Sequence, residues 1–131
     1  MRHEVADADT AVALGSGDVP VLGTPRLIAW MEAATVRAAA AFLDPDQTTV
    51  GTAIRIDHRR ATAVGETVEI TATPPVDTGG RLLTFEVLAV DGSGQVVAAG
   101  QIDMVIVDRR RFLEAASRRP PEWPSRDATR C

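Results

Sequence analysis

Lysine and tyrosine are absent from this sequence, and cysteine and aromatic residues are scarce. Without tyrosine, the protein cannot use any mechanism that depends on a tyrosine hydroxyl. The one cysteine, Cys131, is the last residue, which excludes an internal disulfide, a cysteine-rich metal site and a prenylation motif. No window approaches the length of apolar sequence that a membrane span needs, and Glu4, Asp7 and Asp9 stand where a signal peptide would carry its basic flank. These absences predict a cytoplasmic protein that does not bind a membrane.

The chain has fewer basic than acidic residues. Its 14 arginines and 18 acidic residues give a net charge of −4 and a pI of about 5.1. This balance argues against a partner made of phosphate backbone, so nucleic acid binding is not expected. The two histidines, His3 and His58, show no paired ligand spacing, so no metal site is expected either. A length of 131 residues, 45% of them hydrophobic, predicts a single compact domain.

One long helix is predicted in the first third of the chain. Thr24 is a favourable N-cap and Pro25 is favoured at the first helical position, so the helix should begin there. It should run to about Phe42, because Pro45 follows shortly after. Apolar and small residues recur at spacings of three and four and define its buried stripe: Leu27, Met31, Ala34, Ala38 and Ala41. The many alanines predict a close approach to a neighbouring backbone, such as a sheet that curls round the helix.

Strand patterns occupy most of the remaining sequence. Residues 5–14 suggest a strand that ends in turn-forming residues at 15–18. After residue 48 the period becomes two, and one face of the next strand carries Val50, Thr52, Ile54, Ile56 and His58. Turn-forming segments at 77–80 and 91–94 separate the later strands. Three further strands and a short helix are predicted at residues 67–72, 81–90, 95–107 and 109–117.

The order of these elements indicates an α+β fold. The predicted order is a strand, a long helix and four antiparallel strands. In this order the strands form one sheet, and the helix packs on one face of it. A curled antiparallel sheet of about five strands around one long alanine-rich helix is the hotdog fold. Such a small domain exposes a sheet edge and apolar surface, so a homodimer is expected. Residues 118–131 contain three prolines and no periodic pattern, so we predict a domain at 1–117 and a disordered or loosely docked tail.

Four residues stand out chemically, and each has a structural alternative. Glu32 lies beside the buried stripe with no basic residue three or four positions away, so it is either solvent-exposed or functional. His58 ends a strand on its apolar face, as either a hydrogen-bonded structural residue or a catalytic one. Thr24 is first an N-cap, although its hydroxyl also stands where free helix N–H groups can stabilise a negatively charged oxygen. Gly51 is either a bulge or a point where a ligand approaches the backbone.

The spacing of these residues identifies a resemblance. Over roughly residues 10–115, the chain resembles the fluoroacetyl-CoA thioesterase-like family of hotdog proteins, most clearly in segments 21–34, 49–65, 79–86 and 107–113. The family's catalytic threonine falls on Thr24 in a Gly-Thr-Pro motif, and its glutamate falls on Glu32, eight positions later in a Met-Glu pair. Its histidine falls on His58, and its acyl-site glycine falls on Gly51, seven positions before that histidine.

The resemblance implies hydrolysis of the thioester of a small or medium acyl-CoA, with no cofactor besides the coenzyme A of the substrate. His58 would act as general base or would activate Thr24 as a nucleophile, with Glu32 orienting it or activating water. The sequence leaves open whether Thr24 or water attacks. Gly51 and Gly23 would contact the substrate. Candidates for the phosphates of coenzyme A are Arg55, Arg59, Arg60 and Arg81.

The sequence also departs from the family. In the last strand, relatives often carry histidine and arginine where this chain has Ile102 and Met104, so the contacts of those side chains are not implied here. No residue identifies a pocket that reads fluorine, so a broader or different acyl-CoA is expected. Two other classes stay open, a hotdog hydratase of enoyl- or hydroxyacyl-thioesters and a non-catalytic acyl-CoA-binding module. A hydratase normally needs an aspartate–histidine pair, and the adjacent Asp57 and His58 face opposite ways.

Overall fold

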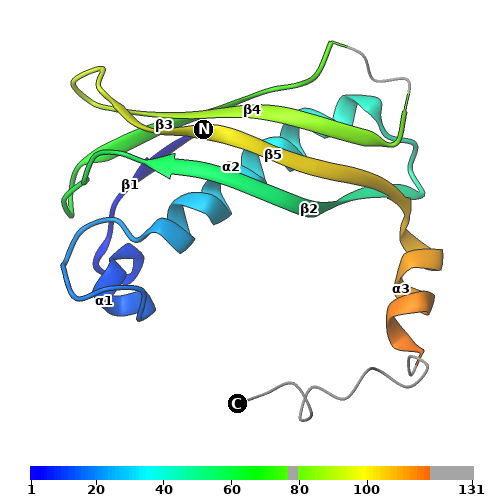
Figure 1. Ribbon diagram of the computed structural model, residues 1–131, viewed down its shortest axis with the longest axis horizontal. Coiled ribbons are helices and arrows are strands. Elements are labelled where there is room, and N and C mark those ends of the chain that lie inside the picture. The colour runs from blue at the N-terminus through cyan, green and yellow to red at the C-terminus, as the bar shows by residue number, and fades with distance from the viewer. Residues whose placement is uncertain (77–79, 119–131) are drawn as a thin grey trace.

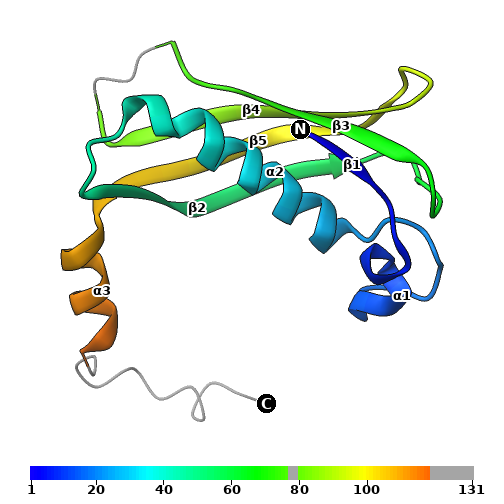
Figure 2. The same cartoon turned by 180° about the vertical axis from the view of Figure 1, so that it is seen from behind.

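The computed structural model describes residues 1–76 and 80–118. One antiparallel sheet, with strand order β1-β3-β4-β5-β2, curls over a single long helix, α2 (Figures 1 and 2). The strands are β1 (Arg2–Glu4), β2 (Gln47–His58), β3 (Thr67–Thr73), β4 (Leu82–Asp91) and β5 (Val96–Asp108). The helical elements are η1 (Asp7–Asp9), α1 (Ala11–Leu14), α2 (Thr24–Ala39), η2 (Ala40–Phe42) and α3 (Arg109–Ser117). This arrangement confirms the predicted five-stranded sheet around one long helix.

Helix α2 begins at Thr24, one residue before the predicted first helical position at Pro25, and the predicted capping role of Thr24 is wrong, because the N-cap is Gly23. The Gly23 carbonyl accepts the N–H groups of Arg26 and Leu27, both at 3.1 Å. A Cβ on Gly23 would come within 3.1 Å of the backbone of Ala11 in α1. The cap position lies so close to α1 that a side chain there would be crowded. Thr24 is therefore the first helical residue, and its hydroxyl is not used to cap the helix.

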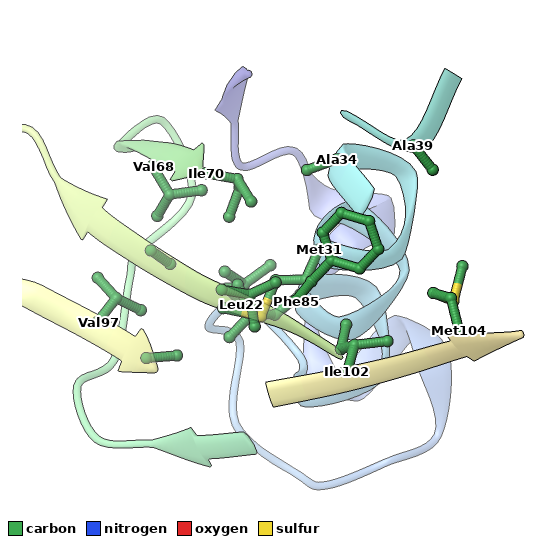
Figure 3. Packing of buried hydrophobic residues seen from close by; sticks show 14 of the residues in the cluster. Leu22, Met31, Ala34, Ala39, Val68, Ile70, Phe85, Val97, Ile102 and Met104 are labelled. Atoms are coloured by element: carbon green, nitrogen blue, oxygen red, sulfur yellow. The ribbon is translucent and has the colours of Figure 1, made fainter. Parts of the chain in front are cut away.

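The buried face of α2 forms one core with the sheet. Leu27 and Met31 are fully buried, and Figure 3 shows Met31 from the helix in one cluster with Phe85 from β4. The predicted stripe is therefore confirmed in its first half. Near the end of the helix the buried residue is Ala39. Ala41 is exposed, because residues 40–42 form the 3-10 helix η2, which has three residues per turn and so rotates Ala41 away from the predicted stripe.

The strand predicted for residues 5–14 is wrong, because those residues form η1 and α1 instead. Local hydrogen bonds from side chains decide the outcome. The Asp9 carboxylate accepts the N–H of Ala6 at 2.8 Å, and Thr10 Oγ1 accepts the N–H of Ala13 at 3.2 Å. Short polar side chains that satisfy nearby backbone groups stabilise turns and helix starts over extended chain.

Strand β2 lies at the edge of the sheet, pairs with β5 and contains a bulge. The register passes from Gly51 opposite Met104 to Ala53 opposite Asp103, which leaves Thr52 as an extra residue. The interpretation of Gly51 as part of a bulge is therefore confirmed. Because β2 lies at the edge, its outer backbone N–H and C=O groups have no strand beside them within residues 1–76 and 80–118.

The bulge reverses the alternation of side chains along β2. Gly51 and Ile54 lie opposite Met104 and Ile102, which are both buried core residues, so these two positions face the helix together. Val50 precedes the bulge and turns to the other face. The predicted face is correct from Ile54 to the end of the strand and wrong for Val50, because a single inserted residue shifts a period of two.

Helix α3 is confirmed at the predicted residues, and both views show α1 and α3 extending past the β2 edge of the sheet (Figures 1 and 2). The Asp108 carboxylate accepts the N–H of Arg111 at 2.9 Å and caps α3. The predicted turn at 91–94 is confirmed, whereas the one at 77–80 lies largely outside the described residues. Of the predicted tail only Arg118 is described, so the boundary at 117 stays a prediction. None of the described helices is long and apolar enough to span a bilayer.

Candidate active site

Thr24 and His58 meet at the N-terminal end of α2. Strand β2 ends at His58, which lies beside the first residue of the helix. A hydrogen bond of 2.7 Å joins Thr24 Oγ1 and His58 Nδ1. Since Thr24 does not cap the helix, its hydroxyl is available for this bond. The structure therefore brings together two of the three residues that the sequence predicts to be catalytic.

The surroundings of His58 favour its neutral form. Burial is the main influence and lowers the pKa of His58 below 6.5, while the nearby backbone of Arg60 opposes part of this effect. Within the described part of the chain, the buried Nε2 atom of His58 has no hydrogen-bond partner. A neutral imidazole next to a hydroxyl can accept its proton, which is the chemistry of a general base.

The loop that follows His58 is anchored to the turn between β4 and β5. Arg60 Nε donates to Asp91 Oδ2 at 3.0 Å. Asp91 Oδ1 accepts hydrogen bonds from the Ser93 hydroxyl at 2.7 Å and from the N–H groups of Ser93 and Gln95 at 2.9 and 3.0 Å. These bonds, led by the one from the Ser93 side chain, lower the pKa of Asp91 to about 2. The anchor is thus a carboxylate that stays ionised well into acid.

Glu32 lies against β2 two helical turns beyond Thr24. A Cβ built on Gly51 would stand 2.8 Å from Glu32 Oε2 and 3.6 Å from Met104 Sδ. The half-buried Glu32 carboxylate therefore reaches the strand only because residue 51 has no side chain. Gly51 is both a bulge residue and a point of close approach, and the group that approaches it is Glu32.

Glu32 does not meet His58 within one chain. Eight residues of α-helix separate Thr24 from Glu32 by about 12 Å. Seven residues of bulged strand separate Gly51 from His58 by about 20 Å. Two groupings result, which we call the Thr24–His58 pair and the Glu32–Gly51 pair, and they occupy separate points along the seam between α2 and β2.

The start of α2 carries one free backbone donor. Gly23 N–H donates to the carbonyl of Asp9 at 2.9 Å, and the Gly23 carbonyl is used by the first helical turn. Because the fold uses both of its backbone groups, the predicted contact of Gly23 with substrate stays a prediction. The N–H of Thr24 has no hydrogen-bond partner in residues 1–76 and 80–118, and Pro25 has no N–H to offer.

Two features of the site escape sequence reasoning. Met104 is buried and faces Gly51 beside Glu32; the period-two pattern of the last strand could have placed it there. The Arg60–Asp91 ion pair joins residues that are distant in the sequence, so no local sequence pattern predicts it. Across the described ranges, no group of three histidine, cysteine, aspartate or glutamate side chains is arranged to hold a metal ion.

The curled antiparallel sheet over one central helix is the hotdog fold of thioester hydrolases. The chain belongs to the fluoroacetyl-CoA-specific thioesterase family, whose model matches residues 5–110. It is 33% identical to the fluoroacetyl-CoA thioesterase of Streptantibioticus cattleyicolor over 101 residues, which cover 77% of this chain and 71% of that protein.

Solved structures agree with this assignment. A phenylalanine-to-alanine variant of the fluoroacetyl-CoA-specific thioesterase, in complex with fluoroacetate and CoA, superposes with a TM-score of 0.83 at 28% identity. The match covers 92% of this chain and 98% of that one. A Thermus thermophilus protein of the thioesterase superfamily shares the fold, with a TM-score of 0.80 at 21% identity over 88% of this chain and 85% of its own. The predicted family, hotdog fold and thioester hydrolase class are confirmed.

Proposed function

We propose that this chain hydrolyses the thioester bond of a small or medium acyl-CoA in the cytoplasm, with Thr24, Glu32 and His58 as its catalytic residues. The observation that carries the proposal is the 2.7 Å contact between Thr24 Oγ1 and His58 Nδ1 in a chain of this family. Relatives named for fluoroacetyl-CoA, one of them in complex with CoA, support an acyl-CoA substrate. Coenzyme A enters as part of the substrate, and the proposal needs no separate cofactor.

His58 is the general base of the proposed reaction. In the tautomer that carries its proton on Nε2, the Nδ1 atom accepts the hydrogen bond of the Thr24 hydroxyl. The lowered pKa of His58 keeps the imidazole neutral at pH 7, where it can take up a proton. A threonine hydroxyl has no useful anion at that pH, so an adjacent base is required if Thr24 attacks.

Two routes lead to the same products. In one, Thr24 Oγ1 bonds to the carbonyl carbon while its proton passes to His58. The carbon–sulfur bond then breaks, the proton goes to the departing thiolate, and water hydrolyses the acyl-threonine ester. In the other, His58 or Glu32 takes a proton from a water molecule that attacks the carbonyl directly, the carbon–sulfur bond breaks, and the base returns that proton to the departing thiolate. On either route the free Thr24 N–H can donate to the oxygen as it gains negative charge.

We propose that a complete site forms between two chains. The Glu32–Gly51 pair is too far from the Thr24–His58 pair of its own chain, and β2 offers an unpaired edge that is exposed from Gly51 to Arg55. If two β2 edges pair antiparallel about the midpoint between Ile54 and Arg55, His58 comes opposite Gly51 of the partner subunit. Each Thr24–His58 pair then receives a carboxylate, and the homodimer is the active unit.

Substrate contacts are proposed for Gly51 and Gly23. Gly51 leaves room beside the Glu32 carboxylate, and Gly23 precedes the free N–H of Thr24. The acyl group would lie along the apolar seam, where Ile54 is 43% exposed in the single chain. An apolar seam without a feature that recognises fluorine favours a range of small or medium acyl groups.

The proposal is tested by release of free thiol, followed with a thiol-reactive dye, over a panel of saturated, fluorinated and unsaturated acyl-CoAs. We expect thiol release by the native protein and a loss of at least about a hundredfold in Thr24→Ala. Thr73→Ala, at an exposed position on β3, is the matched control and should retain full activity. Water addition to an enoyl-CoA without thiol release would instead indicate a hydratase, and tight binding without turnover a binding module.

A further inference from the structure

A cavity of about 440 Å³ lies where α3 leaves the sheet, at the opposite end of β2 from His58. Its walls include Gln47 at the start of β2, Arg81 before β4, Ile106 near the end of β5, and Arg111 and Phe112 on α3. The cavity therefore belongs to neither the Thr24–His58 pair nor the Glu32–Gly51 pair. Two arginines and one aromatic ring line it, Arg81 from the segment before β4 and Arg111 and Phe112 from α3.

The guanidinium of Arg81 is held in a fixed orientation. Its Nε donates to the carbonyl of Ile106 at 3.1 Å, and Ile106 N–H in turn donates to the Arg81 carbonyl at 2.8 Å. With Nε used in this way, the terminal nitrogens of Arg81 stay available for a ligand. No carboxylate lies within ion-pair distance of Arg81 in the part of the chain that the structure covers.

The second arginine of the cavity, Arg111, is likewise not neutralised by an ion pair within residues 1–76 and 80–118. One acidic residue, Asp108, also lines the cavity. Asp108 Oδ1 accepts the backbone N–H of Arg111 at 2.9 Å as the cap of α3. Glu114 pairs with Arg110 at 3.6 Å. With two arginines and one aspartate in its lining, the cavity carries a net positive charge in a protein of net charge −4, which favours binding of an anion.

Arginine forks bind phosphate oxygens through paired hydrogen bonds, which makes arginine the preferred residue for phosphate recognition. The ring of Phe112, 43% exposed, adds a flat surface on which a base can stack. We propose that this cavity binds the phosphorylated adenosine end of the acyl-CoA, with Arg81 and Arg111 on the phosphates and Phe112 against the adenine. The assignment rests on the proposed function and adds the position of the nucleotide to it.

The substrate reaches this cavity across the dimer. Within one chain, eleven residues of β2 place Gln47 more than about 30 Å from His58. In the antiparallel pairing of two β2 edges, however, His58 lies opposite Gly51 of the partner subunit. Gln47 of the partner subunit is only four residues, about 13 Å, further along that strand. The extended pantetheine arm spans such a distance, so the thioester lies at one chain's Thr24–His58 pair and the nucleotide in the other chain's cavity.

The test compares an acyl-CoA with the matching acyl-N-acetylcysteamine thioester, which keeps the acyl group and thioester but lacks the nucleotide. Arg111→Gln removes a guanidinium without touching the backbone N–H that Asp108 caps. We expect Arg111→Gln to raise the KM for acyl-CoA about tenfold, the loss of one charge-assisted interaction, with kcat unchanged. The truncated thioester should show no change. Arg81→Gln should behave alike, whereas Arg2→Gln, which removes the same charge on β1, should change neither substrate.

An equal effect on both thioesters, or no effect on either, would overturn the assignment of the cavity and leave thioester hydrolysis standing. If the native protein hydrolyses neither thioester, the proposed function fails, and the cavity is then decided by calorimetric titration with adenosine 3′,5′-bisphosphate. Binding that Arg111→Gln weakens about tenfold would support a nucleotide site. An absence of binding to the native protein would overturn it.

Discussion

His58 is the residue on which the proposed turnover depends most directly. His58→Ala removes the base that accepts the proton of Thr24 or of water, so kcat should fall by about a hundredfold or more. The fold should survive, since within the described chain His58 makes one side-chain hydrogen bond, the one to Thr24. Thiol release together with thermal unfolding measures both effects. A folded variant with nearly full activity would assign His58 a structural role.

The pH profile supplies a second readout of the same residue. Burial lowers the pKa of His58 in the folded protein, so the neutral base persists below pH 6.5. The acid limb of kcat/KM should therefore fall on the acid side of pH 6.5, with a plateau through neutral pH. This limb should be missing from the residual activity of His58→Ala.

Gly51 holds the Glu32 carboxylate in place by having no side chain. Gly51→Ala puts a Cβ 2.8 Å from Glu32 Oε2, so the carboxylate must move, and we expect kcat to drop at least about tenfold. Gly92→Ala is the matched control, because its Cβ would meet only Thr67 Oγ1 at an ordinary 3.5 Å. Equal activity of the two variants would show that the position of Glu32 has no influence on catalysis.

At the scale of elements, the turn between β4 and β5 carries a charge on which stability depends. The pKa of Asp91 is lowered from 3.8 to about 2, so its stabilising effect is fully present above the unfolded value and is lost as pH falls through about 2. Asp91→Asn should therefore be less stable than the native protein at neutral pH, with the difference shrinking in acid. Denaturant unfolding across the pH range measures this.

Asp18→Asn, at an exposed position with no side-chain hydrogen bond in the described residues, is the control and should leave stability unchanged. A constant difference between the native protein and Asp91→Asn at every pH would contradict the ionic account of this turn. The anchor also holds Arg60, two residues from His58, so a loosened turn should reach the Thr24–His58 pair as well.

The predicted tail should be dispensable. The sequence from 118 onward has three prolines and no apolar periodicity, so it offers no face to bury. Truncation after Ser117 should preserve dimerisation and hydrolysis, and it retains all of α3 with Arg111. Size-exclusion chromatography and the thiol assay test this directly, and loss of soluble expression would show that the tail docks on the domain.

Elements with a strong period were predictable and elements set by single contacts were not. The α2 pattern and the four alternating strands follow from burial of one face, which the sequence displays at every turn of the helix and every second residue of a strand. Residues 5–14 were wrongly predicted as a strand, because the side chains of Asp9 and Thr10 form hydrogen bonds with nearby backbone N–H groups. The bulge at Thr52 went unrecognised as a change of face, since one extra residue leaves no periodic trace.

The candidate site was predictable only through the spacing of its residues in a family. Thr24 and His58 are joined by a contact between distant parts of the chain, which no local pattern encodes. The close approach of Glu32 to Gly51 depends on the crossing of α2 over β2, a property of packing and not of either segment. The capping role of Thr24 was mispredicted for a related reason, because α1 presses on the cap position.

At the scale of the whole molecule, the proposal requires two chains for each site. Thr24→Ala and Glu32→Ala homodimers should both be nearly inactive. Co-refolded in equal amounts, they should yield heterodimers with one intact and one doubly altered site. Since half of the dimers would be mixed, about a quarter of native activity should return.

If Thr24 and Glu32 instead act within one chain, every site of the mixed dimer is defective. If a verified heterodimer shows no recovery of activity, the proposal that Thr24 of one chain acts with Glu32 of the other is therefore wrong. Assignment of the chain to its family would be untouched by that result.

The bulge in β2 has a consequence for how this protein can change over generations. Deleting Thr52 would remove the extra residue and restore regular alternation, while Gly51 stayed opposite Met104 and Ala53 opposite Asp103. Gly51 itself has no such freedom, because a side chain there would stand where the Glu32 carboxylate now fits. Lineages that keep this chemistry can therefore lose a codon at the bulge, but they must keep the glycine beside it.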